Sequence, residues 1–379
     1  MITHLSSPVT VNWGITARCN FVCSHCFSRL DPSEELSPEE ARRVVDVLAE
    51  QSVMFLNYGT GEPLLRRDLF PLTDYAVSRG LKVTMNSNGS LLDAAAARRI
   101  REAGFHSIGI SIDSAIPSTH DAFRRMPGSF EKAVRAARLL REEGVPLTVS
   151  SVICKVNHGD FPALVALAKE LGAHTIDLHN FKCSGMGGLN REALDLSPDE
   201  WRRFYEAAVP MRDMEKGIAI AFDDPILSLL GAEAMGKLVA GSVCGKLSLY
   251  IKPNGEITPC GFIPVTIGHI LRDDFGEVWH GSKVLEHLRT KAAAGKCSGC
   301  AKFSACLAAA PPAPSPCTAR TTPPILTAGR TTGKIDTSPI ALTVFRVQWE
   351  DFEAGGDSWI FRCRCGSDGT STSGSGPAA

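Results

Sequence analysis

The sequence has no excess of either charge and no long apolar run. Its 379 residues carry 40 Lys and Arg against 41 Asp and Glu, a formal net charge of −1, which argues against broad electrostatic capture of nucleic acid or anionic lipid. No apolar run approaches the roughly 18 residues that span a bilayer, and Met1–Leu5 lacks the basic region and apolar stretch of a secretory signal. We therefore expect a cytoplasmic protein that binds neither nucleic acid nor a membrane.

Cysteine is too sparse for a disulfide scaffold, yet it is grouped. Thirteen cysteines in 379 residues lie far below the roughly 8–10% of small disulfide-rich proteins. In a reducing compartment, closely spaced cysteines are more often metal ligands than disulfide partners. The sequence therefore predicts two metal-binding segments, one with Cys19, Cys23 and Cys26 and one with Cys244, Cys260, Cys297, Cys300, Cys306 and Cys317.

Residues 9–222 alternate short β-branched runs with helical stretches. Six strand–helix units in series predict parallel strands joined by crossover helices, and six are too few for a full eight-stranded barrel. We therefore expect an α/β fold built on a partial (β/α)6 barrel. The expected strands lie near residues 10–16, 53–58, 81–86, 107–113, 147–153 and 174–179, and the expected helices near 38–51, 68–78, 93–103, 130–143, 161–171 and 198–215.

The ends of the helices carry their own signals. Ser37 and Ser197 are each followed by Pro and acidic residues, and Ser129 directly precedes a helical stretch. A serine hydroxyl accepts a hydrogen bond from the first helical turn, so all three are expected to be N-caps. Glycines after four of the helices predict left-handed caps at Gly80, Gly104, Gly144 and Gly172.

Polar motifs follow four consecutive strands. Cys19 follows the first strand, Gly59–Pro63 the second and Asn86–Gly89 the third, while Ser111 and Asp113 end the fourth. The carboxyl ends of parallel strands share one edge, which is where such folds place their active sites. The sequence therefore predicts one site at this edge.

The first cysteine group supplies three thiolates within one loop, Cys19-x3-Cys23-x2-Cys26. A structural zinc ion usually takes four protein ligands, and a [4Fe–4S] cluster held only by protein takes four cysteines. Two interpretations follow. The loop binds zinc with His25 as the fourth ligand, or it binds a cluster with one iron open to a non-protein ligand.

Together with Thr60-Gly61-Glu62-Pro63 after the second strand, this loop resembles the signature of the radical S-adenosylmethionine (SAM) enzymes, over about residues 9–222. The resemblance implies that Cys19, Cys23 and Cys26 hold a [4Fe–4S] cluster. It also implies that the amino and carboxylate groups of SAM chelate the fourth iron. The reduced cluster would then cleave SAM to a 5′-deoxyadenosyl radical, which abstracts a substrate hydrogen.

The remaining polar residues of the edge fit SAM chemically. Carbonyls of the turn Thr60–Pro63 would accept bonds from the SAM ammonium, with Glu62 adding negative charge, although the family pattern has Gly where this chain has Thr60. Arg124 would pair with the SAM carboxylate; its alternative is a solvated surface charge. Asn86–Gly89 also fits an ordinary turn. The residues expected around SAM are Thr60, Gly61, Glu62, Pro63, Asn86, Ser87, Ser111, Asp113 and Arg124.

The second cysteine group resembles the SPASM/twitch extension of some radical SAM enzymes, which binds one or two auxiliary [4Fe–4S] clusters; the alternative is a zinc ribbon. Residues 250–262 predict a hairpin that turns at Pro253–Gly255. The resemblance implies five ligands, Cys244, Cys260, Cys297, Cys300 and Cys306.

The chain departs from the SPASM pattern after Cys306. The pattern has a cysteine four residues further on, where this chain has Ala310 and an Ala/Pro-rich stretch. Residues 307–379 are then a disordered tail or an out-of-frame reading of a GC-rich gene, and Cys317, Cys363 or Cys365 would have to complete the ligand set. The expected divisions are a barrel over 9–222, a connecting helix over 223–243, an auxiliary-cluster domain over 244–306 and the tail over 307–379.

The resemblance implies an oxidoreductase or lyase that attacks an unactivated C–H bond, with a flavodoxin or ferredoxin as electron donor. Its substrate would be a peptide to be matured, or a small molecule such as an antibiotic sugar, aminocyclitol, nucleoside or tetrapyrrole. His179, Asp177, Lys182 and Asp223 are candidates for the substrate pocket, and no catalytic residue is assigned. The alternative function is a non-catalytic iron–sulfur or zinc sensor or scaffold, which would need the cysteines but not Glu62, Ser111 or Asp113.

Overall fold

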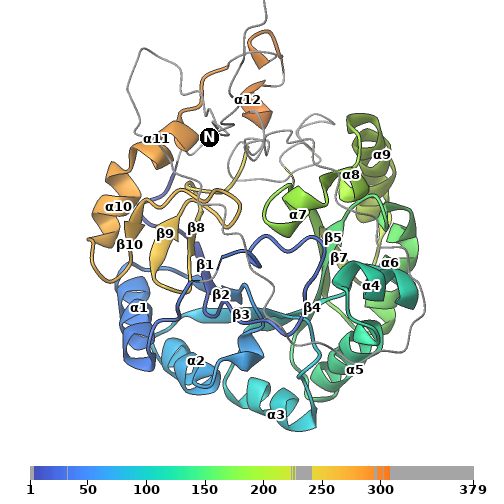
Figure 1. Ribbon diagram of the computed structural model, residues 1–379, viewed down its shortest axis with the longest axis horizontal. Coiled ribbons are helices and arrows are strands. Elements are labelled where there is room, and N and C mark those ends of the chain that lie inside the picture. Colours follow the sequence, from blue (N-terminus) through green and yellow to red (C-terminus); the bar gives the residue numbers. More distant parts are fainter. Residues whose placement is uncertain are drawn as a thin grey trace, which may run out of the picture. The chain divides into compact units, whose positions relative to one another are not determined.

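The computed structural model describes residues 4–307 except 32, 223, 225–226, 228–240, 294–296 and 302. Among these residues, ten strands form one sheet in the order β10-β9-β8-β1-β2-β3-β4-β5-β6-β7. Strands β1 to β7 are each parallel to the next, and helices surround them on the outside (Figure 1). The strands are β1 Thr10–Gly14, β2 Phe55–Gly59, β3 Lys82–Ser87, β4 Ser107–Ser111, β5 Leu147–Ile153, β6 Thr175–Asn180, β7 Ala219–Phe222, β8 Ser248–Ile251, β9 Glu256–Thr258 and β10 Gly268–His269.

The structure confirms the α/β fold, and each of the six expected helices is present. The helices are α1 Pro38–Glu50, α2 Leu69–Ser78, α3 Ala94–Glu102, α4 Pro117–Arg124, α5 Ser129–Glu142, α6 Phe161–Glu170, α7 Met186–Leu189, α8 Arg191–Leu194, α9 Pro198–Met214, α10 Phe275–Gly281, α11 Lys283–Arg289 and α12 Phe303–Cys306. Strand β7 and helices α4, α7 and α8 are additional to the expected elements of the barrel. No helix among the described residues is long and apolar enough to cross a membrane.

Two of the three expected N-caps are confirmed. Ser37 and Ser197 each form a reciprocal capping box, with Glu40 and Glu200 respectively. The third expectation was wrong, because Ser129 is the first residue of α5 and Gly128 is the N-cap. A carboxylate from α4 satisfies this helix start instead. Asp121 accepts hydrogen bonds from the amides of Gly128 and Phe130 and from the Ser129 hydroxyl, at 2.6 to 2.8 Å.

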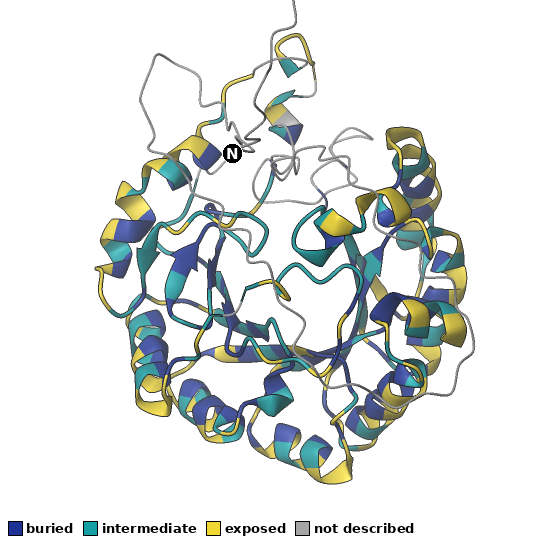
Figure 2. Cartoon of the chain, in the orientation of Figure 1, coloured by how far each residue is buried: buried dark blue, intermediate teal, exposed yellow. Residues whose placement is uncertain are grey.

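The core lies between the outer face of the sheet and the helices. Along each barrel strand, the residues that face the helices are fully buried, as with Trp13, Tyr58 and Met85. Their neighbours on the inner face, such as Asn12 and Asn57, remain partly open to solvent. The helices bury the sides that face the sheet and expose the opposite sides (Figure 2). The inner face therefore carries polar residues that a ligand can reach.

The expected hairpin is present and joins the barrel sheet. Strands β8 and β9 pair antiparallel on either side of the turn at Lys252–Gly255, and β8 lies parallel to β1 with Tyr250 opposite Asn12. Trp279 of α10 is buried and donates a hydrogen bond to the carbonyl of Leu5. The segment with the second cysteine group is thus continuous with the barrel through β1.

Several expectations fall on residues that are not described. They concern Asp223, most of the expected connecting helix over 223–243, and the tail beyond Leu307 with Ala310, Cys317, Cys363 and Cys365. All described residues belong to one compact unit, Met1–Ala313.

Candidate functional site

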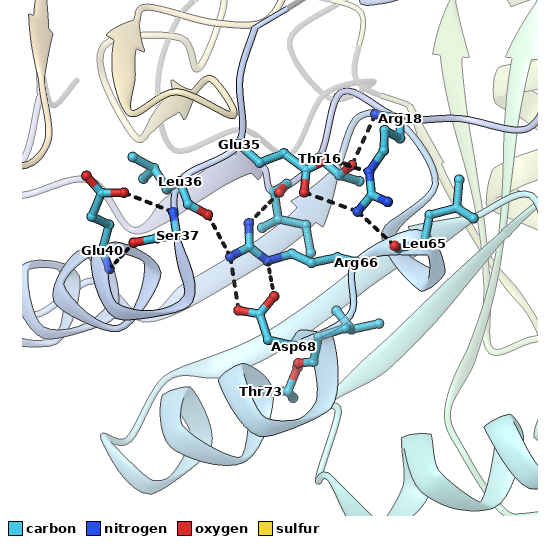
Figure 3. Close-up of polar contacts among 12 residues, drawn as sticks. Thr16, Arg18, Glu35, Leu36, Ser37, Glu40, Leu65, Arg66, Asp68 and Thr73 are labelled. Carbon is cyan, nitrogen blue, oxygen red and sulfur yellow. Dashed lines mark hydrogen bonds and ion pairs between the residues drawn. The ribbon is translucent and has the colours of Figure 1, made fainter.

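One buried arginine closes the loop that carries the first three cysteines. This loop runs from β1 to α1, and Arg66 donates to the carbonyl of Ile15 at its start (2.7 Å) and to that of Leu36 at its end (3.1 Å). Asp68 holds the guanidinium through two contacts of 3.0 Å (Figure 3). Arg66 is only 4% exposed, so its charge is desolvated and its bonds are directional. The two ends of the loop are therefore fixed relative to each other.

The same loop is tied to the turn after β2. Arg18 pairs with Glu35 at 2.8 Å and donates to the carbonyl of Leu65 at 2.9 Å (Figure 3). Its own carbonyl accepts a bond from the amide of Glu62 at 2.8 Å. The structure thus brings Cys19 and the Thr60–Pro63 turn to one edge of the sheet, as the sequence predicts.

The middle of the loop is bonded to α4 and to the segment after β6. The Ser24 amide donates to the carbonyl of Phe123 at 3.0 Å, and the Asn190 side chain donates to the carbonyl of Ser24 at 2.9 Å. The amide of Met186 donates to the carbonyl of Cys26 at 2.9 Å. Contacts from α4 and from the segment after β6 therefore hold the backbone between the cysteines.

The three thiols suit a metal cluster. Burial raises the pKa of Cys23 to about 11, although the Arg124 guanidinium opposes the shift. Burial also raises the pKa of Cys19. Cys19 and Cys23 are therefore protonated at neutral pH without metal, and bound iron would replace their protons. Cys19 and Cys26 are each within electrostatic range of Cys23.

The structure disfavours the zinc loop with His25 as ligand. The His25 ring stacks on Phe123, with centroids 4.3 Å apart and planes 16° apart. Among the described residues, no three His, Cys, Asp or Glu side chains lie close enough to share one metal ion. In a [4Fe–4S] cluster each cysteine binds a different iron, so its ligands are spread more widely than those of one zinc ion. The residues present fit the cluster.

The turn after β2 has a left-handed backbone and a buried carboxylate. Thr60 and Gly61 have φ of +67° and +63°, and a Cβ on Gly61 would lie 2.5 Å from the carbonyl oxygens of Thr16 and Arg18. Glu62 is fully buried and accepts from the Ser87 hydroxyl (2.8 Å) and the Asn88 amide (2.8 Å). Burial raises the pKa of Glu62 against these donors. Glu62 therefore joins the carboxyl ends of β2 and β3, a partner set that the sequence did not reveal.

Asp113 and Arg124 form a buried ion pair. Arg124 Nε lies 2.6 Å from Asp113 Oδ2, and Asp113 Oδ1 accepts from the amide of Val152 at 2.9 Å. Burial opposes ionisation of Asp113, but Arg124 outweighs it and lowers the pKa of this carboxyl to about 2. The alternative for Arg124, a solvated surface charge, was wrong, since the residue is 8% exposed. Both oxygens of Asp113 therefore have protein partners.

Other polar residues line the inner face near these groups. Asn86 is exposed, and Ser111 is half-buried and in register with Ser150 on β5. Ser150 is in turn opposite Asp177 on β6, whose carboxylate lies 3.5 Å from His179 Nε2. The alternation of the strand pattern could have revealed Ser150, because it shares the inner face with Ser111. Lys182 donates to Asn180.

The second cysteine group is brought together in part. A side-chain hydrogen bond with Cys244, together with burial, raises the pKa of Cys260 well above its ordinary value, so these two thiols are adjacent. Cys306 is buried and Cys300 is exposed. Burial lowers the pKa of Lys291, opposed by Cys244, Cys306 and Cys297. These three thiols therefore lie within electrostatic range of one lysine.

Comparisons with known proteins agree with this geometry. Residues 13–168 match the model of the radical SAM superfamily, and residues 244–301 match that of an iron–sulfur cluster-binding domain, SPASM. The AdoMet-dependent heme synthase of Methanosarcina barkeri is 32% identical over 81% of this chain and 92% of its own. The mycofactocin maturase MftC of Mycolicibacterium smegmatis is 31% identical over 80% of this chain and 78% of its own.

Solved structures share the fold. SuiB of Streptococcus suis bound to S-adenosylmethionine superposes with a TM-score of 0.69 at 17% identity, over 81% of this chain and 73% of SuiB. SuiB bound to its precursor peptide SuiA gives a TM-score of 0.68 at 17% identity, over 81% and 72%. The chain therefore belongs to the SPASM branch of the radical SAM superfamily, whose cofactors are a [4Fe–4S] cluster, S-adenosylmethionine and auxiliary iron–sulfur clusters.

Proposed function

We propose that the chain cleaves SAM and abstracts a hydrogen atom from an unactivated C–H bond of a substrate held on the inner face of the barrel. The observation that carries this proposal is the loop between β1 and α1, whose ends are joined by Arg66. It holds three thiols, Cys19, Cys23 and Cys26, beside the turn Thr60–Pro63. Three thiolates leave one iron of a [4Fe–4S] cluster open. The cluster and SAM, when bound, supply the 5′-deoxyadenosyl radical.

We assign the proposed roles according to whether a residue is open to a ligand or already bonded to other protein groups. The turn at Thr60–Pro63 offers carbonyls to the SAM ammonium, and Asn86 and Ser111 offer polar groups to the ribose from the inner face. Glu62, Ser87 and Asp113 are satisfied by protein partners, so they position these groups. Arg124 faces Cys23 and Asp113 and holds positive charge beside the cluster loop.

A peptide is the substrate that we propose. The inner face offers hydroxyl, carboxylate and imidazole groups from Ser111, Ser150, Asp177 and His179, which suit the amides and side chains of a peptide. SuiB, which has the same fold, was solved with a precursor peptide. A tetrapyrrole is the second candidate, favoured by the 32% identity to a heme synthase. The relatives named above give no support to an antibiotic sugar, aminocyclitol or nucleoside.

Anaerobic reconstitution with iron and sulfide, followed by dithionite and SAM, tests the proposed chemistry. We expect 5′-deoxyadenosine from the wild-type chain and none from Cys23→Ala. The matched control is Cys154→Ala, a buried core cysteine outside the loop, which should retain SAM cleavage. An iron-loaded wild-type chain that forms no 5′-deoxyadenosine would favour the sensor or scaffold instead. Dithionite stands in for the flavodoxin or ferredoxin that we propose as the donor.

A substrate test follows from the same preparation. Titration with iron-coproporphyrin III, monitored by its absorbance band, should show no saturable binding if the substrate is a peptide. Saturable binding that is lost in Asp177→Asn or His179→Ala would move the assignment to the tetrapyrrole class.

A further inference from the structure

A tyrosine of the C-terminal hairpin reaches the turn that follows β2. Tyr250 lies on β8, is 7% exposed, and places its hydroxyl 2.7 Å from Thr60 Oγ1. The end of β1 makes room for this contact. A Cβ on Gly14 would lie 2.6 Å from the Tyr250 hydroxyl and 3.0 Å from Thr60 Cβ. The hydrogen bond is therefore enclosed by β1 on one side and by the hairpin on the other.

The backbone conformation of Thr60 is unfavourable for a threonine and would be unstrained for a glycine. Its φ is +67°, a region in which a β-branched residue is an outlier and glycine is unstrained. Its side-chain hydroxyl bonds to Tyr250, 190 residues away in the sequence. This long-range bond stabilises a backbone shape that the residue itself disfavours.

The same tyrosine contacts the first cysteine-bearing loop at Phe27, which in turn contacts the second loop. Its ring contacts Phe27 edge-on at 6.1 Å between centroids, and Phe27 contacts Phe262 at 4.8 Å. Phe27 directly follows Cys26, and Phe262 comes two residues after Cys260. A Cβ on Gly261 would lie 2.7 Å from the Phe27 ring, so the two loops approach closely here.

We propose that Tyr250 is a positioning residue for SAM binding, through which the C-terminal iron–sulfur domain holds the SAM-binding turn in shape. The inference rests on the proposed function, because it takes Thr60–Pro63 as the turn that binds the SAM ammonium. Tyr250 itself touches Thr60 and does not need to touch SAM. Carbonyls at this turn accept hydrogen bonds only if the left-handed backbone at Thr60 is maintained, and the Tyr250 hydroxyl maintains it.

Equilibrium dialysis of SAM against the anaerobically reconstituted full chain, without reductant, tests this coupling. Tyr250→Phe should weaken SAM binding by about fivefold to tenfold, the net size of one hydrogen bond. Thr60→Val removes the same bond from the barrel side and leaves the hairpin intact, so it should cause a similar loss. Combining it with Tyr250→Phe should add less than about twofold, since both remove one interaction.

The variant Thr60→Gly tests whether Tyr250 acts through the backbone conformation of Thr60. Thr60→Gly adopts the left-handed backbone unaided, so Tyr250→Phe should change SAM affinity by less than about twofold in that background. The matched control is Tyr75→Phe, which loses a 2.6 Å bond to Asp46 on the outside of the barrel and should leave SAM affinity unchanged.

Three outcomes separate the two proposals. Equal losses from Tyr250→Phe in the wild-type and in the Thr60→Gly background would overturn the coupling, and so would wild-type affinity in Tyr250→Phe and Thr60→Val. A wild-type chain that contains its iron but binds no SAM would overturn the proposed function itself. Iron content and unfolding temperature, measured for each variant, show that the protein compared is folded and loaded.

Discussion

The two cysteine segments are held in different ways. The first lies in a loop whose ends are joined by Arg66 and whose middle is bonded to Phe123, Met186 and Asn190, all of which come from distant parts of the barrel. In the second, the described backbone bonds around Cys297–Leu307 run within the segment, such as the 3.1 Å bond from the Cys300 amide to the Cys297 carbonyl.

From this difference we infer that the first cysteine segment is already ordered in the metal-free protein. Distant contacts fix the first loop at the edge of the sheet, so cluster binding there costs little ordering of the backbone. The second segment has only local backbone contacts around Cys297–Leu307, so we expect the bound metal to order it. Metal binding and folding are then coupled there. The hairpin that carries Cys244 and Cys260 is intermediate, because β8 pairs with β1.

The largest expected effect is a difference in SAM cleavage between cysteine variants of the two segments. Cys23→Ala should abolish 5′-deoxyadenosine formation, because it removes one of the three ligands that we propose for the cluster that binds SAM. Cys300→Ala should lose roughly four irons per chain and still cleave SAM. Iron analysis and chromatographic assay of 5′-deoxyadenosine measure both. Loss of SAM cleavage in Cys300→Ala, with the first cluster still present in the electron paramagnetic resonance spectrum, would contradict the separation.

A second variant tests the buried ion pair behind the first segment. Asp113→Asn leaves Arg124 without its counter-charge, so we expect the free energy of unfolding of the iron-free protein to fall by about 3–5 kcal/mol. Urea titration measures it. Glu170→Gln is the control, since its pair with Arg138 is 3.6 Å long with both side chains more than half exposed, and it should cost about 0–1 kcal/mol. Equal losses in the two variants would refute the role of burial.

The same pair predicts a pH dependence with a definite sign. The pKa of Asp113 is about 2 in the folded chain against an ordinary 3.8. As the pH falls, the unfolded chain takes up this proton first, so the stabilisation is complete above the ordinary pKa and is lost between about pH 4 and pH 2. Urea titrations of the iron-free protein should show wild type approaching Asp113→Asn over this interval. A constant difference would contradict the assignment.

The smallest expected effect concerns the tether from the segment after β6. Asn190→Ala removes the bond to the Ser24 carbonyl and one to Met186, so the free energy of unfolding should fall by about 1 kcal/mol. Amide exchange at residues 23–26 should increase in the same variant. Unchanged exchange there would show that this tether does not hold the loop.

Much of the barrel could be predicted, because its signals are local. Capping boxes at Ser37 and Ser197 and left-handed glycines such as Gly80 and Gly104 mark helix ends within a few residues of sequence. Strand β7, four residues long, carries no such signal and is defined by its pairing with β6. Helix α4 lacks a side-chain cap at Ile116.

At the site, the residue types were predictable and their partners were not. The cysteine spacing and the turn Thr60–Pro63 indicate the chemistry from adjacent residues. The bonds of Glu62 to Ser87 and Asn88, and of Thr60 to Tyr250, join residues 25 to 190 positions apart. Such contacts join side chains on different strands and loops, so the positioning roles emerge only from the folded chain.

Hydrogen–deuterium exchange of the iron-free and the reconstituted protein tests the contrast between the two segments most directly. Residues 18–27 should show the same protection in both states, because Arg66, Phe123 and Asn190 hold the loop without metal. Residues 297–307 should be protected only after reconstitution. Strong exchange of residues 18–27 in the iron-free protein, equal to that of residues 297–307, would contradict the account.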